Sequence, residues 1–430
     1  MKRLIGVVIL LGAAAVGAIA VTARGVPPLP SVEQVSARIA DLEHGRYVAT
    51  LGDCASCHTA PGGPAFAGGR ALATPIGTVY STNITPDRDT GIGGYDFAEF
   101  LRLMRHGVAP GGRWIYPAMP FTAYAKMSDD DLFDLFAYLQ REVDPVRRLN
   151  QPPAIAWPLS WRAPLALWTK SFHHAQPFED DPAQDAEWNR GAYLVQGPAH
   201  CGTCHTPRNW AMAESEEPGQ FLSGTAFNGG SPINLRGNQG DGLARWSEQD
   251  VVDLLRTGRN AHSAVSGDMV EVVAASTQYF SDDDLRAIAR YVKSLSPADE
   301  AGRGQFAASQ ASLDRIMQGK EQSSGGRIFM DSCAACHRLG GGGAALAFPG
   351  LAGNASVLSK DPSSLIAVIL AGTSLPSTAK APSPLAMPGF AWRYDDEEVA
   401  ALATYLRSSW GNQASAVTAS QVAKVRRHRQ

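Results

Sequence analysis

The five-residue motif C-x-x-C-H occurs three times in this chain of 430 residues, at positions 54–58, 201–205 and 333–337. The chain has six cysteines, and these motifs contain all of them. Two thiols three positions apart can each form a thioether bond with a haem vinyl group, and the adjoining histidine can then bind the iron. The fold must therefore enclose each motif together with its haem.

Two other roles of paired cysteines fit the pattern less well. A zinc site would need further cysteine or histidine ligands in paired clusters, and no cysteine remains. A disulfide within each C-x-x-C would leave the repeated histidine without a role. We therefore predict three covalently bound haem c groups, with His58, His205 and His337 as the proximal iron ligands. The thioether bonds would come from Cys54, Cys57, Cys201, Cys204, Cys333 and Cys336.

The N-terminus has the pattern of a secretory signal. Lys2 and Arg3 precede an apolar run over residues 4–21, which is followed by a small-residue site ending at Ala20 or Ala23. The run is also just long enough to cross a bilayer as a helix. We predict that residues 1–23 are a signal peptide, with a retained anchor as the alternative. Both interpretations place the body of the chain outside the cytoplasm.

The composition is that of a globular protein with many loops. Hydrophobic residues make up 44% of the chain and charged residues 18%, with 43 glycines and 28 prolines. The formal net charge of −3 gives no indication of a nucleic-acid partner.

The three motif regions share one order of elements. A short helical pattern with a glycine and an aromatic residue precedes each motif, and a helical pattern ending at a glycine follows it. An amphipathic helix with a Ser or Asp cap and an acidic first turn then begins near residue 128, 281 or 395. We predict an all-α chain of three tandem class I cytochrome c domains with loop-rich connections, at 31–144, 186–297 and 323–410. We refer to these as the first, second and third repeats. The early glycine–aromatic pairs are Gly45 and Tyr47, Gly191 and Tyr193, and Gly326 and Phe329.

The connecting segments differ in composition. Residues 145–185 are rich in proline and tryptophan, which predicts an extended strap lying on protein. Residues 298–322 form a polar, weakly helical linker. The tail, 411–430, ends in a basic cluster, so that it either contacts an anionic membrane surface or is a solvated terminus.

Each repeat offers one methionine as a distal iron ligand. Met119 and Met387 are each followed by proline in a loop before the last helix, and Met269 occupies the same place in the second repeat. Three His/Met pairs would close both axial positions and raise the reduction potentials. Met104 and Met127 lie on helical patterns or at their edges, so we interpret them as core residues.

Other polar residues near the motifs are weaker candidates. His106 and His262 are rival distal ligands, but a lone histidine near a helix end more often makes an ordinary hydrogen bond. His200, directly before Cys201, is expected at the edge of the second haem. Arg70 and Arg208 could donate to haem propionates, although solvated arginine is the default interpretation.

With these units in tandem, the chain resembles the triheme cytochrome c subunit of bacterial membrane-bound alcohol, gluconate, fructose/sorbitol and aldehyde dehydrogenases. The resemblance covers nearly the whole chain. It is most specific at residues 188–195, 201–209 and 269–278, and the last match supports Met269 as a ligand. The chain departs from that family's pattern at Gly267-Asp268, directly before Met269.

The resemblance implies a non-catalytic electron-transfer subunit. A catalytic subunit with flavin, pyrroloquinoline quinone or molybdenum would oxidise the substrate, together with a small subunit. The cytochrome would pass electrons to ubiquinone or a terminal oxidase at the periplasmic face of the inner membrane, with peripheral membrane contact. The alternatives are a free-standing multihaem carrier and a multihaem peroxidase, which would need one haem with an open distal position.

Overall fold

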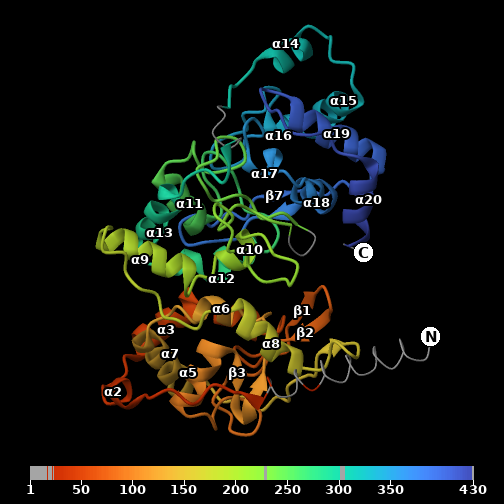
Figure 1. The fold of residues 1–430 in the computed structure, drawn as a ribbon. Coiled ribbons are helices and arrows are strands. Elements are labelled where there is room, and N and C mark those ends of the chain that lie inside the picture. Colours follow the sequence, from red (N-terminus) through yellow and green to blue (C-terminus); the bar gives the residue numbers. More distant parts are fainter. Residues whose placement is uncertain (1–16, 18–21, 23, 227–229, 301–305, 429–430) are drawn as a thin grey trace, which may run out of the picture. The chain divides into compact units, whose positions relative to one another are not determined.

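The computed structural model describes residues 17, 22, 24–226, 230–300 and 306–428. The expected signal segment, 1–23, lies almost entirely outside these residues. The chain divides into two compact units, which are described separately (Figure 1). Unit 1 comprises the chain up to Asp180 together with Gln196–His200, and unit 2 comprises Asp181–Val195 and Cys201–Gln430. No helix among the described residues is long and apolar enough to cross a membrane.

Unit 1 contains the first repeat and the strap. Its helices are α2 (Glu33–Ser36), α3 (Leu42–Leu51), α4 (Cys54–His58), α5 (Phe97–His106), α6 (Phe121–Tyr124), α7 (Asp129–Arg141) and α8 (Ala163–Phe172). Its strands are β1 (Ala71–Thr74), β2 (Gly77–Tyr80), β3 (Val108–Ala109), β4 (Arg113–Trp114) and β5 (Ala154–Ile155), and a 3-10 turn spans Pro110–Gly112.

Unit 2 contains the second and third repeats. The second has α9 (Ala186–Gln196), α10 (Gly202–His205), α11 (Glu248–Thr257), α12 (Met269–Ala275), the 3-10 turn Thr277–Tyr279 and α13 (Asp282–Ser294). The linker and third repeat have α14 (Ala311–Met317), α15 (Ser324–Ser332), α16 (Ala334–His337), α17 (Ala355–Leu358), α18 (Ser363–Ala371), β6 (Thr373–Ser374), β7 (Ala386–Met387), α19 (Asp396–Ser408) and α20 (Ala419–Arg427).

The helix boundaries follow the capping residues. Helix α7 begins after Ser128, whose side chain accepts a hydrogen bond from the Asp131 amide. Helix α5 begins with a capping box at Asp96 and ends at Gly107, which has a φ of 66°. A side-chain oxygen at the start and a left-handed glycine at the end satisfy backbone groups that the helix itself leaves unpaired.

The loops contain short strands that an all-α interpretation does not include. Strands β1, β2 and β5 form an antiparallel sheet in which Leu72 lies opposite Val79 and Gly77 opposite Ile155. Two further ribbons pair β3 with β4 and β6 with β7. The described structure is still mainly helical. The strands arise where extended loop segments run side by side and pair backbone groups that would otherwise be buried without partners.

One helix crossing occurs three times. In each repeat, a glycine of the early helix lies against the backbone of the last helix, where an added Cβ would overlap a carbonyl oxygen. The same Cβ would also lie 2.8 Å from the Cβ of a tyrosine on the last helix. A side chain at any of these positions would push the helices apart. The glycine, carbonyl residue and tyrosine are Gly45, Asp134 and Tyr138; Gly191, Ala287 and Tyr291; and Gly325, Ala401 and Tyr405.

In the third crossing, Gly325 is the residue at the helix contact. Gly326, which forms the glycine–aromatic pair with Phe329, faces the Glu321 side chain. The periodic pattern alone does not distinguish two adjacent glycines, because only the position of the partner helix decides which one needs to be small.

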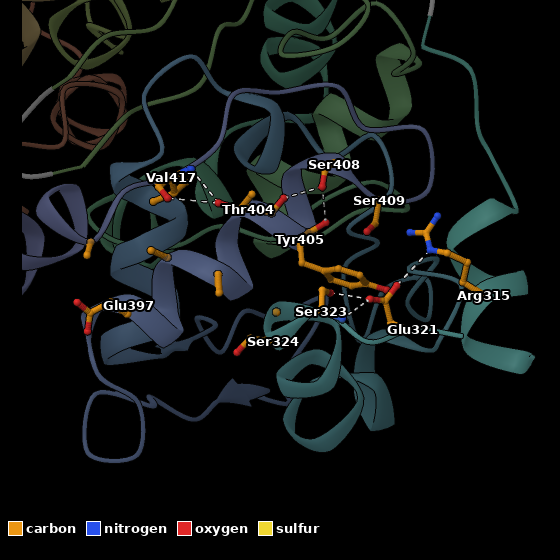
Figure 2. A pocket seen from close by; sticks show the side chains of 14 residues that line it. Arg315, Glu321, Ser323, Ser324, Glu397, Thr404, Tyr405, Ser408, Ser409 and Val417 are labelled. Atoms are coloured by element: carbon orange, nitrogen blue, oxygen red, sulfur yellow. Dashed lines mark hydrogen bonds and ion pairs between the residues drawn. The ribbon is translucent and has the colours of Figure 1, made fainter. Parts of the chain in front are cut away.

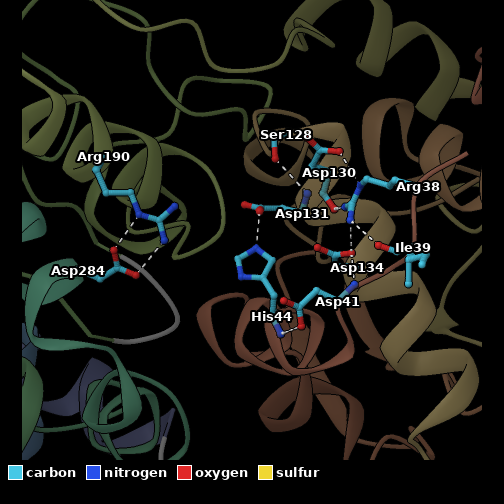
Figure 3. Close-up of polar contacts among 10 residues, drawn as sticks. All are labelled: Arg38, Ile39, Asp41, His44, Ser128, Asp130, Asp131, Asp134, Arg190 and Asp284. Atoms are coloured by element: carbon cyan, nitrogen blue, oxygen red, sulfur yellow. Dashed lines mark hydrogen bonds and ion pairs between the residues drawn. The ribbon is translucent and has the colours of Figure 1, made fainter. Parts of the chain in front are cut away.

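The crossings in the first two repeats share a buried polar contact (Figure 3). His44, directly before Gly45, has its Nε2 atom 2.8 Å from Asp131. Arg190, directly before Gly191, donates two hydrogen bonds of 2.8 and 2.9 Å to Asp284. Asp131 and Asp284 are the third acids of the matching first turns. Each acid therefore holds the early helix of its repeat through this contact. Its negative charge also stabilises the positive N-terminal end of its own helix.

The strap and the tail are more structured than expected. Helix α8 forms within the proline-rich segment. Pro164 does not prevent it, because this proline occupies the first turn, where proline is tolerated. Helix α20 packs against α18 and α19 with Val422 and Val425 buried, and Arg426 forms a 2.7 Å ion pair with Asp396. Residues 419–427 are therefore not a frayed terminus.

The helix crossing can be tested with Gly191→Ala. Alanine normally stabilises a helix by about 1 kcal/mol relative to glycine, but here the overlap with Ala287 should cost about 1–3 kcal/mol in free energy of unfolding. Denaturant unfolding of the haem-loaded protein measures the change. Gly94→Ala is the control, because the nearest atom to its added Cβ is 3.7 Å away. Equal stability of the two variants would contradict the crossing.

Candidate haem-attachment sites

Each C-x-x-C-H motif forms a short helical turn, in α4, α10 and α16. The first two turns are entered through a left-handed residue, Asp53 with φ of 50° and His200 with φ of 38°. All six cysteines are free thiols, so no disulfide forms among them in the described chain. The turn places the two thiols of a motif one helical turn apart, with the histidine directly after the second thiol.

Each of the three motif histidines makes the same kind of hydrogen bond, from its ring to a backbone carbonyl oxygen. The Nδ1 atom lies 2.6 Å from the Thr82 carbonyl oxygen in His58, 2.8 Å from that of Ile233 in His205 and 2.9 Å from that of Pro349 in His337. A carbonyl oxygen can only accept, so Nδ1 donates. This bond fixes the ring and leaves the lone pair of Nε2 for a metal. Neither Ile233 nor Pro349 has a side chain that would signal this role in the sequence.

Burial controls the protonation of these groups. It lowers the pKa of His58, His205 and His337, although the bonds to the carbonyl oxygens partly oppose it, so the rings are neutral at pH 7. Burial also raises the pKa of Cys54 and Cys201 to about 12 and that of Cys333 to about 11. Each of these thiols is further disfavoured as an anion by the second cysteine of its motif.

A metal ion binds cysteines as thiolates and releases their protons on binding. Within the described residues, no three or more His, Cys, Asp or Glu side chains are grouped so that they could hold a metal ion. Neutral thiols beside a neutral, anchored imidazole do fit haem c, which takes thioether bonds from the cysteines and one axial nitrogen from the histidine.

Two arginines hold the motif turns. Arg70 donates a 2.8 Å hydrogen bond to the carbonyl oxygen of Ser56, and Arg208 donates to that of Thr203. Ser56 and Thr203 occupy the same position, directly before the second cysteine. Arg208 also lies 3.8 Å from Glu214. The sequence singled out both arginines, and the structure gives them a contact with the motif backbone.

The predicted distal methionines lie in different local structures. Met119 precedes α6 and packs on the same apolar cluster as Cys54. Met269 is the first residue of α12, and Met387 lies in β7 opposite Thr373. All three are partly buried. Met104 and Met127 are buried in the first-repeat core, as expected for core residues.

Of the three other histidines singled out, His106 is the last residue of α5, and His262 and His200 have side-chain contacts of their own. The Nε2 atom of His262 lies 3.3 Å from Asp250, and its ring stacks on Trp246 at 5.8 Å. The ring of His200 packs edge-on against Tyr124 at 5.6 Å, and the Tyr124 hydroxyl donates to the Gly52 carbonyl oxygen at 2.6 Å. His262 is therefore held by an acid and an indole, as an ordinary structural histidine would be.

The second and third repeats share an apolar cluster within unit 2. Val265, Met269 and Val273 of the second repeat pack with Leu375 and Leu385 of the third. A Cβ added at Gly258, where α11 ends, would lie 2.9 Å from the ring of Pro376. Nearby, Ser231 donates through its amide to Ser364 at 2.6 Å and through its hydroxyl to the Asp361 carbonyl oxygen at 2.7 Å. The segment that begins with Met269 is thus supported by the third repeat.

A groove of about 610 Å³ lies beside the crossing of α15 and α19. Figure 2 shows the Tyr405 side chain directed toward Glu321, which accepts from Ser323 at 2.6 Å and lies 3.3 Å from Arg315. Burial of Glu321 opposes its charge, but the hydrogen bonds from Ser323 and Arg315 lower its pKa. These contacts tie the linker helix α14 to the third repeat.

Comparison with known proteins places the chain among cytochromes. The family model for cytochrome c matches residues 322–410. The chain is 44% identical over 395 residues to the gluconate 2-dehydrogenase cytochrome c subunit of Pantoea cypripedii, covering 90% of this chain and 89% of that protein. It is 45% identical over 395 residues to the alcohol dehydrogenase (quinone) cytochrome c subunit of Komagataeibacter europaeus, covering 90% and 84%. It is 34% identical over 428 residues to the fructose dehydrogenase cytochrome subunit of Gluconobacter japonicus, covering 94% and 86%.

The second motif can be tested by replacing both of its thiols, Cys201→Ser with Cys204→Ser. We expect one fewer covalently attached haem per chain than in the wild type, because hydroxyl groups do not form the thioether bonds. The haem content per chain, determined as the pyridine haemochrome of the denatured protein, measures this loss. His262→Gln is the control and should leave the haem content unchanged. An unchanged content in the double variant would exclude attachment at this motif.

Proposed function

The chain belongs to the family of cytochrome c subunits of bacterial dehydrogenase complexes, and from this premise we propose that it carries three haem c groups, one in each of three tandem domains. It is a non-catalytic electron-transfer subunit, and its partner is a catalytic dehydrogenase. We further propose that it delivers electrons to ubiquinone or a terminal oxidase at the periplasmic side of the inner membrane.

The observation that carries the proposal is the hydrogen bond from Nδ1 of each motif histidine to a backbone carbonyl oxygen. It supports one haem at each motif, because the same anchoring recurs at three places with different partner residues. The six cysteines, used completely by the motifs, support the same number.

The proposed distal ligands Met119, Met269 and Met387 favour a carrier over a peroxidase. When bound, haem supplies a one-electron change at iron. The motif cysteines and histidines would hold the haem, and the three methionines would exclude water and peroxide from the iron. A peroxidase would need one displaceable distal group, and a thioether in every repeat gives no such position.

The partners are proposed from the family and its named members. Relatives are cytochrome subunits of gluconate, alcohol and fructose dehydrogenases, and one name includes the word quinone. We propose a catalytic subunit that contains flavin, pyrroloquinoline quinone or molybdenum, accompanied by a small subunit. Within unit 2, the shared cluster around Met269, Leu375 and Leu385 supports electron exchange between the second and third haems, because it holds their methionine-bearing segments together.

The ligand assignment can be tested with Met387→Leu, which keeps the volume but removes the sulfur. We expect loss of one of three methionine-to-iron absorption bands in the oxidised protein and a lower potential for one haem, since thioether ligation raises it. The matched control is Met127→Leu, in a residue that is 1% exposed in the first-repeat core. An oxidised spectrum that is identical in the two variants would exclude Met387 as a ligand.

The shared cluster gives a second test, Leu385→Ala in the third repeat. Removing this contact should loosen the segment of Met269 and therefore weaken a methionine-to-iron band that belongs to the second haem. Met269→Ala identifies which band that is. Leu346→Ala, at a third-repeat residue that is 55% exposed, is the control. If Leu385→Ala alters only the third haem, the cross-repeat support of Met269 is wrong.

A further inference from the structure

Unit 1 exposes a cluster of large apolar side chains, which we call the strap patch: Ile76, Trp157, Leu159 and Trp161. Their exposed fractions are 39%, 83%, 54% and 38%. Gly77 of β2 lies opposite Ile155 of β5, and continuing this antiparallel register places Ile76 beside Ala156, next to Trp157. The register therefore brings Ile76 to the start of the turn that carries Trp157, Leu159 and Trp161. Contiguous exposed apolar surface of this kind usually marks an interaction site.

The patch is displayed by a fixed turn. The Ser160 amide donates to the Ala156 carbonyl oxygen at 3.2 Å, and the Trp161 amide donates to that of Pro158 at 3.1 Å. The Tyr116 hydroxyl donates to the Leu159 carbonyl oxygen at 3.3 Å. Two of these hydrogen bonds lie within the turn, and the third comes from Tyr116 outside it. They hold the backbone in a conformation that leaves Trp157 and Leu159 exposed.

Arg162 anchors the end of the same turn. Its guanidinium group lies 4.5 Å from the centre of the Tyr116 ring, and its Nη1 atom donates to the Trp114 carbonyl oxygen at 2.9 Å. Burial lowers the pKa of Arg162, but an arginine remains charged at neutral pH. The positive charge is therefore held at the boundary between the patch and the protein body.

The sequence around the patch has the composition of a membrane-interface segment. No charged side chain occurs from residue 149 to 161, while Arg147 and Arg148 precede this stretch and Arg162 follows it. Tryptophan beside apolar residues, with arginine at the boundary, is typical of protein that enters the lipid headgroup region. The side chain of Arg147 lies 3.4 Å from Asp89 in an exposed ion pair and is itself 77% exposed, so that solvent and headgroups can reach it.

The start of the chain leads to the same part of unit 1. The apolar run of residues 4–21 is followed by Thr22, whose carbonyl oxygen accepts a 3.1 Å hydrogen bond from Lys170 of α8. Val26 packs with Trp114 and Ala166. Helix α8 directly follows the patch turn and exposes Leu167 to 47%. In the retained-anchor alternative, the apolar run therefore ends at the element that adjoins the patch; if the signal is cleaved, the patch acts without it.

We propose that the strap patch inserts into the headgroup region of an anionic lipid bilayer and orients unit 1 on the membrane. This deepens the membrane-side location that forms part of the proposed function and rests on it. Helix α20 is less suited to this role, because Val422 and Val425 are already buried within unit 2. Lys424 and Arg427 stay exposed, so α20 offers charge but little apolar surface.

The test uses the full haem-loaded protein as exported, with vesicles of phosphatidylglycerol and phosphatidylethanolamine. Co-sedimentation measures the partition coefficient of the wild type and of the double variant Trp157→Ser with Leu159→Ser. We expect at least about a tenfold loss of partitioning, because two large apolar side chains no longer enter the bilayer. The matched control is Trp210→Ser with Met212→Ser, at exposed residues of unit 2 (89% and 48%), and it should partition like the wild type.

Equal partitioning of the double variant and the wild type would overturn the proposal. If co-purification of the dehydrogenase subunit were lost at the same time, the patch would be a protein interface. The haem spectrum and the reduction of a soluble acceptor should be the same in all variants. If those readouts fail in the wild type itself, the electron-transfer function is wrong and not the membrane contact.

Discussion

The hydrogen bond from each motif histidine to a backbone carbonyl oxygen is the constraint on which the proposed haem sites depend. His58, His205 and His337 are each buried, and burial disfavours their charged form. A neutral imidazole has one donor and one acceptor nitrogen, so the carbonyl bond determines which nitrogen faces the cofactor. Without it, the motif would present two thiols and a ring of undefined orientation.

The three carbonyl oxygens lie in loops of repeats whose early and late helices cross closely. Gly45, Gly191 and Gly325 let the early and late helices of a repeat approach closely. In the first two repeats a buried acid, Asp131 or Asp284, fixes the contact further. We call the crossed early and late helices of a repeat its frame. The motif follows directly after the early helix of this frame. The frame therefore sets where the cofactor can sit.

The sequence predicts the periodic and chemically explicit parts of this structure. Helix starts at Ser128 and Ser281 and the stop at Gly107 follow from capping chemistry that is local to a few residues. The residues that the sequence does not reveal act through their backbone or through distant partners. Pro349 contributes only a carbonyl oxygen. Whether Gly325 or Gly326 meets the last helix depends on a partner that lies far along the chain. Helix α8 lies in a segment whose prolines suggested an extended strap, since Pro164 is compatible with a first helical turn.

The central claim is that three motifs hold three haems, and the intact mass of the exported protein tests it most directly. Thioether bonds survive denaturation, so each attached haem stays with the polypeptide in a mass spectrum. The account predicts a single species whose mass exceeds that of the processed polypeptide by three haem groups. A species with two haems or fewer, under conditions of full haem supply, would contradict it.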